Sequence, residues 1–466
     1  MIVVRSLDSR GGRLPARGSC FTRSHRRRGR VARMSSAATV NQNVDSMMTL
    51  CAFSPIAAVP LPDGETSVKQ QQRMLDGIRS MMAKTPGLDS WKVVWLGMSS
   101  LRANMAFVVQ NVNDTSELAV CFRGTVFTSL IDLAEDFEVF TQVPFPQGGT
   151  PPAGSKPVIA KGASAAFDEI MSAKCVLGLP GGSGTLVSAL QTLCGPSKPA
   201  TVHLTGHSLG GCLVTTAALF LQSQFAKFNP KVAFDTYTFA APTAGNQDFA
   251  TWFDTQFPHG QAIWNKYDVV ANVWWNLGPG PTSIQSFFPA PGPYASECKD
   301  DKGRTVQSQI QDLAQKLAES GVSPYVQPTQ QAPMNTDYTH HSIDALGKTE
   351  KDWMGQLAYQ HANNTYLTLL GAPTVNIDVP QIKSLSPKKG PGGTTVTIEV
   401  PSTAAFASAC VVYFGSERGT DVKVGTNSIT ATAPRHLGIE TVAVSITNLL
   451  TISDTKKTPA NEFTYI

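Results

Sequence analysis

The sequence lacks the features that mark several large protein classes. No window reaches about 18 uninterrupted apolar residues, the length that a membrane-crossing helix needs, so no transmembrane span is expected. The eight cysteines contain no CxxC pair, and no histidine cluster has the spacing of a zinc site. The sequence therefore gives no reason to expect a metal site or a cofactor, and we predict neither.

The cysteines are scattered along the chain, so we expect most of them to fill the core as small apolar side chains. One alternative stays open: Cys175 and Cys194 could form a disulfide in an oxidising compartment. The full set is Cys20, Cys51, Cys121, Cys175, Cys194, Cys212, Cys298 and Cys410.

The chain also lacks a basic surface for nucleic acid once its first 40 residues are set apart. Residues 1–40 carry ten arginines and one acid, Asp8, which gives this segment a charge of +9. Because the whole chain carries +4, residues 41–466 carry +4 minus +9, or −5. A mildly acidic body has no electrostatic footprint for nucleic acid, so none is predicted as a partner.

The basic leader has two interpretations. Its richness in Arg and Ser and its lack of acids are typical of an organellar transit segment. Alternatively, Met34 begins "MSSAATVNQ" directly after the arginines, and the residues before it are an upstream extension. No apolar stretch follows the arginines as a secretory signal requires. We expect residues 1–40 to be disordered, and the sequence leaves the compartment open.

The length and patterning of the rest predict two folded domains. A chain of 466 residues is long for a single core, since cores usually split beyond roughly 250 to 300 residues. Short apolar strands alternate with helical stretches up to about residue 372, which predicts an α/β fold with a mainly parallel sheet covered by helices on both faces. We assign it to residues 41–375, with an irregular Pro/Gly-rich insertion at 275–303.

Residues 380–466 have a different pattern. The helical period disappears, and short strands separated by turn signals follow one another, among them "TTVTIEV", "CVVYFG" and "ETVAVSITN". This pattern predicts a small all-β sandwich of the immunoglobulin type.

One short stretch carries the clearest chemical signal. "TVHLTGHSLGGCLVTTAALFL", residues 201–221, contains Gly206-His207-Ser208-Leu209-Gly210, which fits G-x-S-x-G. In this pattern a sharp turn between a strand and a helix exposes the serine, and the spaced glycines prevent side-chain collisions across the turn. The helix N-terminus stabilises negative charge there. Ser208 is therefore the predicted nucleophile.

A serine nucleophile needs a base and an acid that orients the base, which follow it in the order acid, then histidine, in this kind of fold. Asp268 closes the apolar strand "AIWNKYDVV", where an acid is costly unless it has a function. Asp235 and Asp254 are weaker candidates, because Asp235 precedes an expected strand and Asp254 lies on an expected helix surface.

Three histidines are candidates for the base. His361 lies at the head of the final helical segment, "LAYQHANNTYLTLLGAP", and is the first candidate. His340 and His341 remain alternatives, either as the base or as exposed loop residues.

Two backbone N–H groups are expected to bind the oxyanion. One belongs to Leu209, directly after the nucleophile. The other candidate is Thr125, at the end of the strand "CFRGT", with its hydroxyl as a possible supplement. The next segment, "VFTSLIDLAEDFEVF" (126–140), is either a mobile lid with an apolar stripe or a packed surface helix. Aromatic residues of the insertion either line the mouth of such a site or belong to the core; they are Trp274, Trp275, Phe287 and Phe288.

Together these motifs resemble the class 3, or fungal-type, lipase family of the α/β-hydrolase superfamily. The resemblance extends over about residues 95–370 and is carried by "FRGT", "GHSLGG", "FAAPTAGNQDFA", Asp268 and a late histidine. It implies a catalytic triad, an oxyanion hole formed by Thr125 and Leu209, and carboxylic-ester hydrolysis without a cofactor. The triad that it implies consists of Ser208, Asp268 and His361.

The tail resembles an IPT/TIG domain, an immunoglobulin-like sandwich. The matching positions are Pro387, Gly390, Gly393, Gly415 and Pro434. Such a fold does not identify a ligand, so the tail is interpreted as a spacer or a docking module whose partner is unknown.

The predicted function is hydrolysis of carboxylic esters through an acyl-enzyme, with an acylglycerol at a lipid–water interface as the expected substrate. A phospholipase A1 or an esterase of broad specificity is the first alternative. The second is an inactive hydrolase scaffold that acts as a binding protein through its immunoglobulin-like tail.

Overall fold

The computed structural model describes most of the chain, with several gaps. Residues 1–40, the oxyanion candidate Thr125, most of the lid candidate, and both His340 and His341 lie outside the described residues. The described residues are 41–58, 66–99, 104–124, 134–135, 137–328, 331–334, 337–339, 347–402, 410–448, 450–451, 453 and 455–466.

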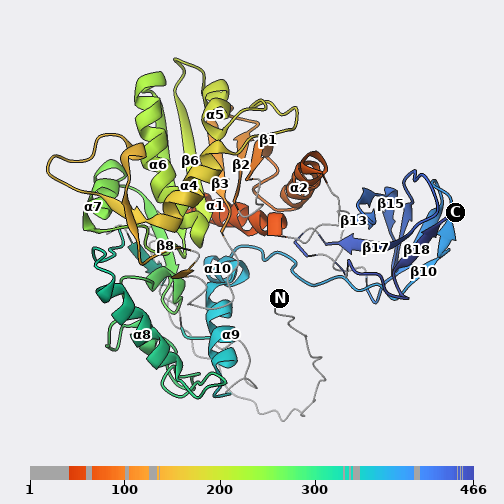
Figure 1. Ribbon diagram of the computed structural model, residues 1–466. Helices are drawn as coiled ribbons and strands as arrows, with labels where there is room; N and C mark the ends of the chain where they lie inside the picture. Colours follow the sequence, from red (N-terminus) through yellow and green to blue (C-terminus); the bar gives the residue numbers. More distant parts are fainter. Residues whose placement is uncertain are drawn as a thin grey trace, which may run out of the picture. The chain divides into compact units, whose positions relative to one another are not determined.

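A seven-stranded sheet forms the centre of the first part of the chain (Figure 1). The first three strands pair antiparallel, and every strand from β3 onward pairs parallel with its neighbour. In spatial order the strands are β1 (Trp91–Met98), β2 (Met105–Asn111), β3 (Glu117–Phe122), β6 (Ala200–His207), β7 (Val232–Phe239), β8 (Gln261–Asn265) and β9 (Gln331–Met334). Because β3, β6, β7 and β8 are parallel, their carboxyl ends meet at one edge, where α/β folds place their sites.

Helices cover this sheet. Figure 1 shows α4, α5 and α6 together, and α6 lies along β6 and β7. From α1, Met47 O and Cys51 Sγ both lie within hydrogen-bond distance of the Thr205 hydroxyl on β6. The helices are α1 (Asn41–Phe53), α2 (Ser67–Met82), α4 (Lys161–Ser172), α5 (Leu186–Cys194), α6 (Leu209–Phe228), α7 (Gln247–Gln256), α8 (Val306–Glu319), α9 (Glu350–His361) and α10 (Asn363–Leu370).

Short elements complete this part of the chain. A separate two-stranded ribbon pairs β4 (Gln142–Pro144) with β5 (Val158–Ala160). The 3₁₀ turns are η1 (Ser54–Ala58), η2 (Pro146–Gly148), η3 (Val270–Asn272) and η4 (Ile284–Ser286). Within 275–303, η4 is the one described helical turn, so the prediction of an irregular insertion is confirmed.

The central helix α6 shows why composition alone does not identify a membrane segment. Most of its residues are apolar and buried inside the protein, as expected for a helix packed between sheet and other helices. Among the described residues it is the single helix whose length and composition would suffice to cross a membrane.

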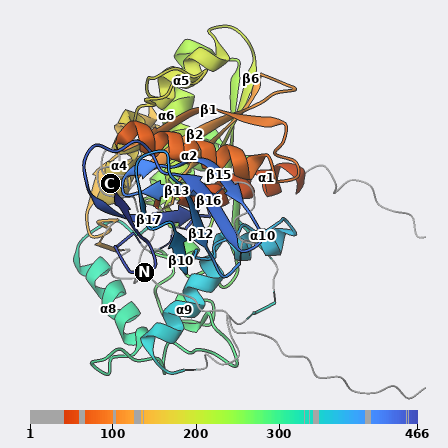
Figure 2. The same cartoon turned by 90° about the vertical axis from the view of Figure 1, so that its right-hand side faces the viewer.

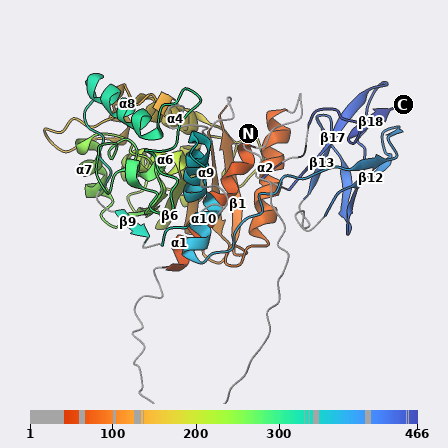
Figure 3. The ribbon, with the colours of Figure 1, turned by 90° about the horizontal axis from the view of Figure 1, so that it is seen from below.

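The last part of the chain consists of two β-sheets with a hydrophobic core of their own (Figures 2 and 3). One sheet has the order β10-β12-β16-β15 and the other β11-β18-β17-β13-β14. The strands are β10 (Ser384–Ser386), β11 (Lys389–Gly390), β12 (Thr395–Glu399), β13 (Val411–Phe414), β14 (Glu417–Arg418), β15 (Thr420–Val424), β16 (Ser428–Thr432), β17 (Thr441–Thr447) and β18 (Glu462–Tyr465). The chain therefore has the predicted α/β fold followed by an immunoglobulin-like sandwich.

Candidate active site

Ser208 occupies a strained turn between β6 and α6. Its φ is 61° and its ψ is −132°, a conformation that residues with a side chain rarely adopt. The turn is held by the Ser208 N–H, which donates to Phe239 O at 2.9 Å, and by the Ser208 carbonyl, which accepts from the Gly211 N–H at 2.9 Å. Sequence reasoning predicted this strand-turn-helix, and the described backbone has it.

The glycines around Ser208 are required by close backbone approaches. A Cβ atom on Gly206 would lie 2.2 Å from the carbonyl carbon of Gly210. A Cβ atom on Gly210 would in turn lie 2.2 Å from the carbonyl oxygen of Phe122, at the end of β3. Only glycine fits at both positions, so the G-x-S-x-G spacing follows from the packing of the turn.

Asp268 lies three residues after β8 and is completely buried. Its Oδ1 accepts from the Val270 N–H at 2.9 Å, and its Oδ2 accepts from the Tyr366 hydroxyl at 2.8 Å. The His361 Nδ1 lies 2.9 Å from the same Oδ2. A buried carboxylate is costly unless it is paired and hydrogen-bonded, and these three partners satisfy that requirement.

His361 is the last residue of α9, which differs from the expected position at the head of a helical segment. The reason is a break at Ala362: its extended backbone ends α9, and α10 begins at Asn363. Asp268 and His361 are thus together, 93 positions apart in sequence.

His207 connects this pair to the serine turn. Its ring centroid lies 4.6 Å from that of His361, and its ring packs edge-on against Tyr366 at 5.3 Å. Because His207 and Ser208 are consecutive, the His361 ring lies beside the turn that carries Ser208. Sequence reasoning gave His207 no role, and its place inside the G-x-S-x-G pattern was the one signal that pointed to it.

The electrostatics of His207 follow from its position. Burial lowers the pKa of its imidazole well below the ordinary value of 6.5, and the nearby charge of His361 lowers it further. A hydrogen bond to the His361 backbone acts in the opposite direction. His207 is therefore a neutral ring beside His361.

The loop after β3 lies against the same turn. A Cβ atom on Gly124 would lie 2.6 Å from the carbonyl oxygen of His207 and 3.0 Å from the Cβ of Ser208. Leu209, the other oxyanion candidate, is the first residue of α6. Thr125 directly follows Gly124 in sequence but lies outside the described residues.

The aromatic residues of the insertion belong mostly to the core. Trp274, Phe287 and Phe288 are buried, whereas Trp275 is 42% exposed. The described end of the lid candidate is also packed, because Phe137 is buried with its ring 6.0 Å from that of Trp274. The burial of Trp274, Phe287, Phe288 and Phe137 agrees with the core alternative, whereas Trp275 is not part of the core. Within segment 126–140 the structure describes residues 134–135 and 137–140.

The other candidates lie elsewhere. Asp235 has a half-exposed carboxylate 3.2 Å from the Nδ1 of His203, and Asp254 is on α7.

Cys175 and Cys194 are both free thiols, so the disulfide left open by the sequence is not formed. Among the residues that the structure describes, no group of three His, Cys, Asp or Glu side chains is arranged to hold a metal ion.

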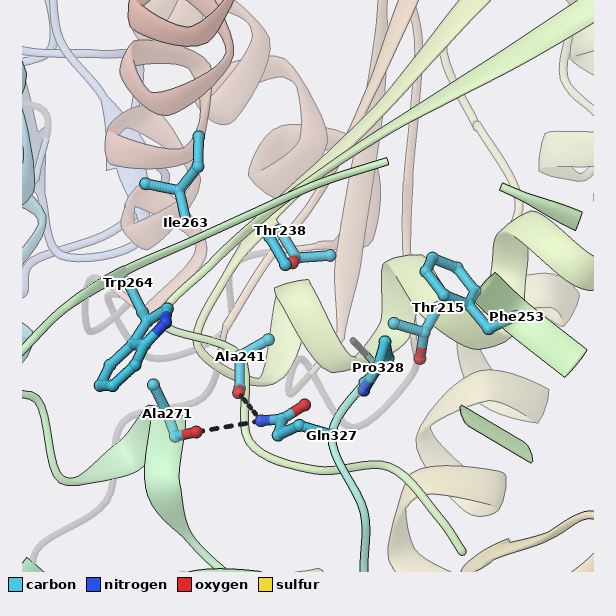
Figure 4. A pocket seen from close by; sticks show the side chains of 10 residues that line it. Thr215, Thr238, Ala241, Phe253, Ile263, Trp264, Ala271, Gln327 and Pro328 are labelled. Carbon is cyan, nitrogen blue, oxygen red and sulfur yellow. Dashed lines mark hydrogen bonds between the residues drawn. The ribbon is translucent and has the colours of Figure 1, made fainter. Parts of the chain in front are cut away.

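A mostly apolar recess lies between α6 and strands β7 and β8 (Figure 4). The empty space within and at the mouth of this recess is about 360 Å³, which includes space open to solvent. The Gln327 amide donates to Ala241 O at 2.7 Å and to Ala271 O at 3.0 Å, so it ties the segment after β7 to the turn after Asp268. The lining residues are Thr215, Thr238, Ala241, Phe253, Ala262, Ile263, Trp264, Ala271, Gln327 and Pro328.

The sheet order and the strained strand-turn-helix at Ser208 define an α/β-hydrolase fold. More particularly, residues 119–276 match the family model described as lipase (class 3), and residues 380–465 match that of the IPT/TIG domain. The chain therefore carries a class 3 lipase domain followed by an IPT/TIG domain. No curated protein matches the sequence.

Three solved lipase structures are similar to this chain. M37 lipase is 22% identical with a TM-score of 0.56, and the match covers 70% of this chain and 92% of that one. Rhizomucor miehei lipase, in its native propeptide complex, is 18% identical with a TM-score of 0.34, covering 51% and 65%. A triacylglycerol lipase from Penicillium expansum is 18% identical with a TM-score of 0.34, covering 51% and 75%. At such identities the likeness to M37 lipase concerns the fold alone.

Proposed function

We propose that the protein hydrolyses carboxylic esters, with Ser208 as nucleophile, His361 as general base and Asp268 as the acid that orients it. The single observation that carries this proposal is the 2.9 Å contact between His361 Nδ1 and the buried Asp268 Oδ2, beside the strained turn at Ser208. An acid that holds one imidazole nitrogen orients the ring so that the other nitrogen can serve the nucleophile.

The reaction proceeds by acyl transfer. Ser208 Oγ attacks the ester carbonyl while His361 accepts the hydroxyl proton, and Asp268 stabilises the imidazolium. His361 then gives the proton to the departing alcohol. Water, activated by His361, then attacks the acyl-enzyme, and His361 returns the proton to Ser208 Oγ as the carboxylic acid is released. The N–H groups of Leu209 and Thr125 bind the oxyanion in both steps, and losing one such donor typically costs about 10² to 10³ in turnover.

An acylglycerol is the proposed substrate, and the description of the matching family as a lipase supports it. Phospholipase A1 activity or broad esterase activity is the alternative. In this proposal residues 41–375 form the catalytic domain, residues 380–466 form an accessory domain, and residues 1–40 precede them as a leader.

Labelling with a fluorophosphonate tests the nucleophile. The wild-type protein should be labelled and Ser208→Ala should not, whereas an unlabelled wild type would favour the inactive scaffold. A panel of short esters, triacylglycerols and phospholipids tests the substrate. Turnover of phospholipid alone would contradict the acylglycerol proposal.

Three further variants test the base. His361→Ala should lose activity by a factor of order 10⁶, the loss seen when such a unit is deprived of its base. His340→Ala and His341→Ala are the matched controls and should stay close to wild type. A collapse in either of them, with His361→Ala active, would transfer the role of base to that residue.

A further inference from the structure

The IPT/TIG domain carries an unusual surface loop, residues 434–440, between β16 and β17. Leu437 is 99% exposed and Ile439 is 83% exposed, the two highest values for large apolar side chains among the described residues. Gly438 stands between them with a φ of +97°. Single exposed apolar residues are ordinary, but two neighbours that are almost completely exposed on one loop indicate an interaction site.

The base of the 434–440 loop is well anchored. The His436 ring stacks on Tyr465 with centroids 4.4 Å apart, and its Nε2 lies 3.0 Å from Glu440 Oε2. The Tyr465 N–H donates to Glu440 O at 2.8 Å, which joins the loop to β18. These contacts hold His436 and Glu440 in place, so Leu437 and Ile439 extend into solvent from an ordered base.

Basic residues border the loop. Arg435 is exposed and lies beside the turn at Gly392, where an added Cβ would be 2.8 Å from the Arg435 Cα. Lys389 is exposed on β11, whose register with β18 places Gly390 opposite Tyr465. The nearest acid in sequence, Glu440, is paired with His436. The loop thus combines apolar side chains with a positively charged border.

The size and composition of the loop favour a lipid surface over a protein as its partner. A stable protein interface buries about 800 Å² on each partner, far more than two side chains on one loop provide. A lipid surface requires no shape complementarity: a few aliphatic side chains enter the acyl boundary while basic residues contact anionic headgroups. We propose that the 434–440 loop docks the IPT/TIG domain on an anionic lipid surface, with Leu437 and Ile439 inserted and Arg435 and Lys389 facing the headgroups. This inference rests on the proposed lipase function, since it gives the accessory domain the task of holding the enzyme at its substrate.

Vesicle co-sedimentation of the full chain tests the proposal. The probes are phosphatidylcholine vesicles with and without phosphatidylserine. We expect the wild type to bind the anionic vesicles more tightly, and Leu437→Ser/Ile439→Ser to bind them about tenfold more weakly, since two apolar side chains no longer insert. Ile377→Ser/Val379→Ser is the matched control, because these linker residues are also exposed (58% and 42%) and should not matter.

A charge variant separates the two contributions. Arg435→Gln/Lys389→Gln should remove the preference for anionic vesicles and keep the weak binding to neutral ones. Equal binding by wild type and Leu437→Ser/Ile439→Ser, or no binding of the wild type to either vesicle, would overturn the proposal. The proposal would also be overturned if Ile377→Ser/Val379→Ser lost vesicle binding while Leu437→Ser/Ile439→Ser kept it.

Activity measurements separate this inference from the proposed function. The ratio of the rate on an emulsified ester to that on a water-soluble ester should fall in Leu437→Ser/Ile439→Ser and stay at the wild-type value in the linker control. If Ser208→Ala still hydrolysed the soluble ester, the proposed function would fail while vesicle binding remained measurable. If Ser208 were essential but the protein ignored vesicles, only the docking inference would fail.

Discussion

The backbone conformation of Ser208 depends on the residues packed around it. A positive φ at a residue with a side chain is unfavourable, so the surrounding backbone has to enforce it. The enforcing contacts are the approach of Gly206 to Gly210 and of Gly210 to the end of β3. The conformation of Ser208 is therefore maintained by residues that have no functional groups of their own.

Gly206→Ala tests this dependence. The new methyl group would lie 2.2 Å from backbone atoms that cannot move without opening the turn, so we expect severe destabilisation, more than about 3 kcal/mol, and loss of fluorophosphonate labelling. Gly355→Ala is the control, because Gly355 lies inside α9 with no atom within 4 Å of an added Cβ. Alanine in that helix should be neutral or stabilising by up to about 1 kcal/mol. Chemical denaturation measures both variants, and a mild effect at Gly206 would contradict the packing argument.

Tyr366→Phe tests the environment of Asp268. The hydroxyl donates to Asp268 Oδ2 and accepts from the Asn265 N–H at 2.8 Å, so its removal leaves two buried groups short of a partner. We expect a loss of about 1–3 kcal/mol in stability and about a tenfold fall in kcat. Tyr325→Phe removes another buried hydroxyl, bonded to Val139 O, and should lower stability without lowering kcat. Equal kcat losses in both variants would show a purely structural effect.

His207 makes stability depend on pH. Its pKa is lower in the folded protein than the ordinary 6.5, so on acidification the unfolded chain takes up a proton that the folded protein does not. This neutral ring therefore contributes stability above pH 6.5 that is lost as the pH falls below it. His207→Phe keeps an aromatic ring against Tyr366 and removes the titration. Its melting temperature should fall less than that of the wild type between about pH 7 and about pH 5; parallel curves would contradict this explanation.

Sequence analysis identified the residues that have a local signature and missed those whose role depends on contacts between distant positions. Ser208 has a local signature, and Asp268 was proposed because an acid is costly beside an apolar strand; their proposed roles remain predictions. Tyr366 and His207 act through contacts between distant positions, 98 residues apart for Tyr366 and Asp268. No local sequence pattern predicts that a tyrosine hydroxyl will donate to a carboxylate so far away in the chain, so this contact is visible only in the folded structure.

At the scale of elements, local patterns predicted the central strands and helices but not every boundary. The sequence analysis assigned no strand to β1, whose "WKVVWLGM" is a nearly continuous apolar run that periodicity alone cannot distinguish from a buried helix segment. The position of His361 also differed, since the break at Ala362 divides one apparent helical segment into α9 and α10. Boundaries of this kind depend on tertiary packing more than on the local sequence.

The N-terminus of α9 provides a test at this scale. Thr349 and Asp352 form a capping box, in which each side chain accepts from the other residue's backbone N–H. Thr349→Ala should cost about 1 kcal/mol of stability. Because His361 lies at the opposite end of α9, kcat should remain unchanged. Thr305→Ala removes the comparable cap of α8 and is the control for stability. A marked loss of kcat in Thr349→Ala would mean that fraying spreads along α9 to His361.

For the whole molecule, two hydrophobic cores predict two separable unfolding events. The sandwich buries its own set of side chains, with Ile429 on β16 completely inaccessible, and this set is distinct from the core around α6. All seven tryptophans precede residue 380, so tryptophan fluorescence reports on the α/β part alone. Ile429→Ala should cost about 2–5 kcal/mol in the sandwich.

This cost should appear as a lower transition temperature in calorimetry, while the fluorescence transition and the hydrolysis of a soluble ester stay at wild-type values. Leu219→Ala, which creates a similar cavity in α6, should do the reverse and shift the fluorescence transition. If Ile429→Ala instead lowered both transitions together, the two cores would unfold as one cooperative unit. In that case, unfolding of the sandwich would also abolish hydrolysis of a soluble ester. If the two cores are independent, unfolding of the sandwich should lower the rate only on substrate at a lipid surface.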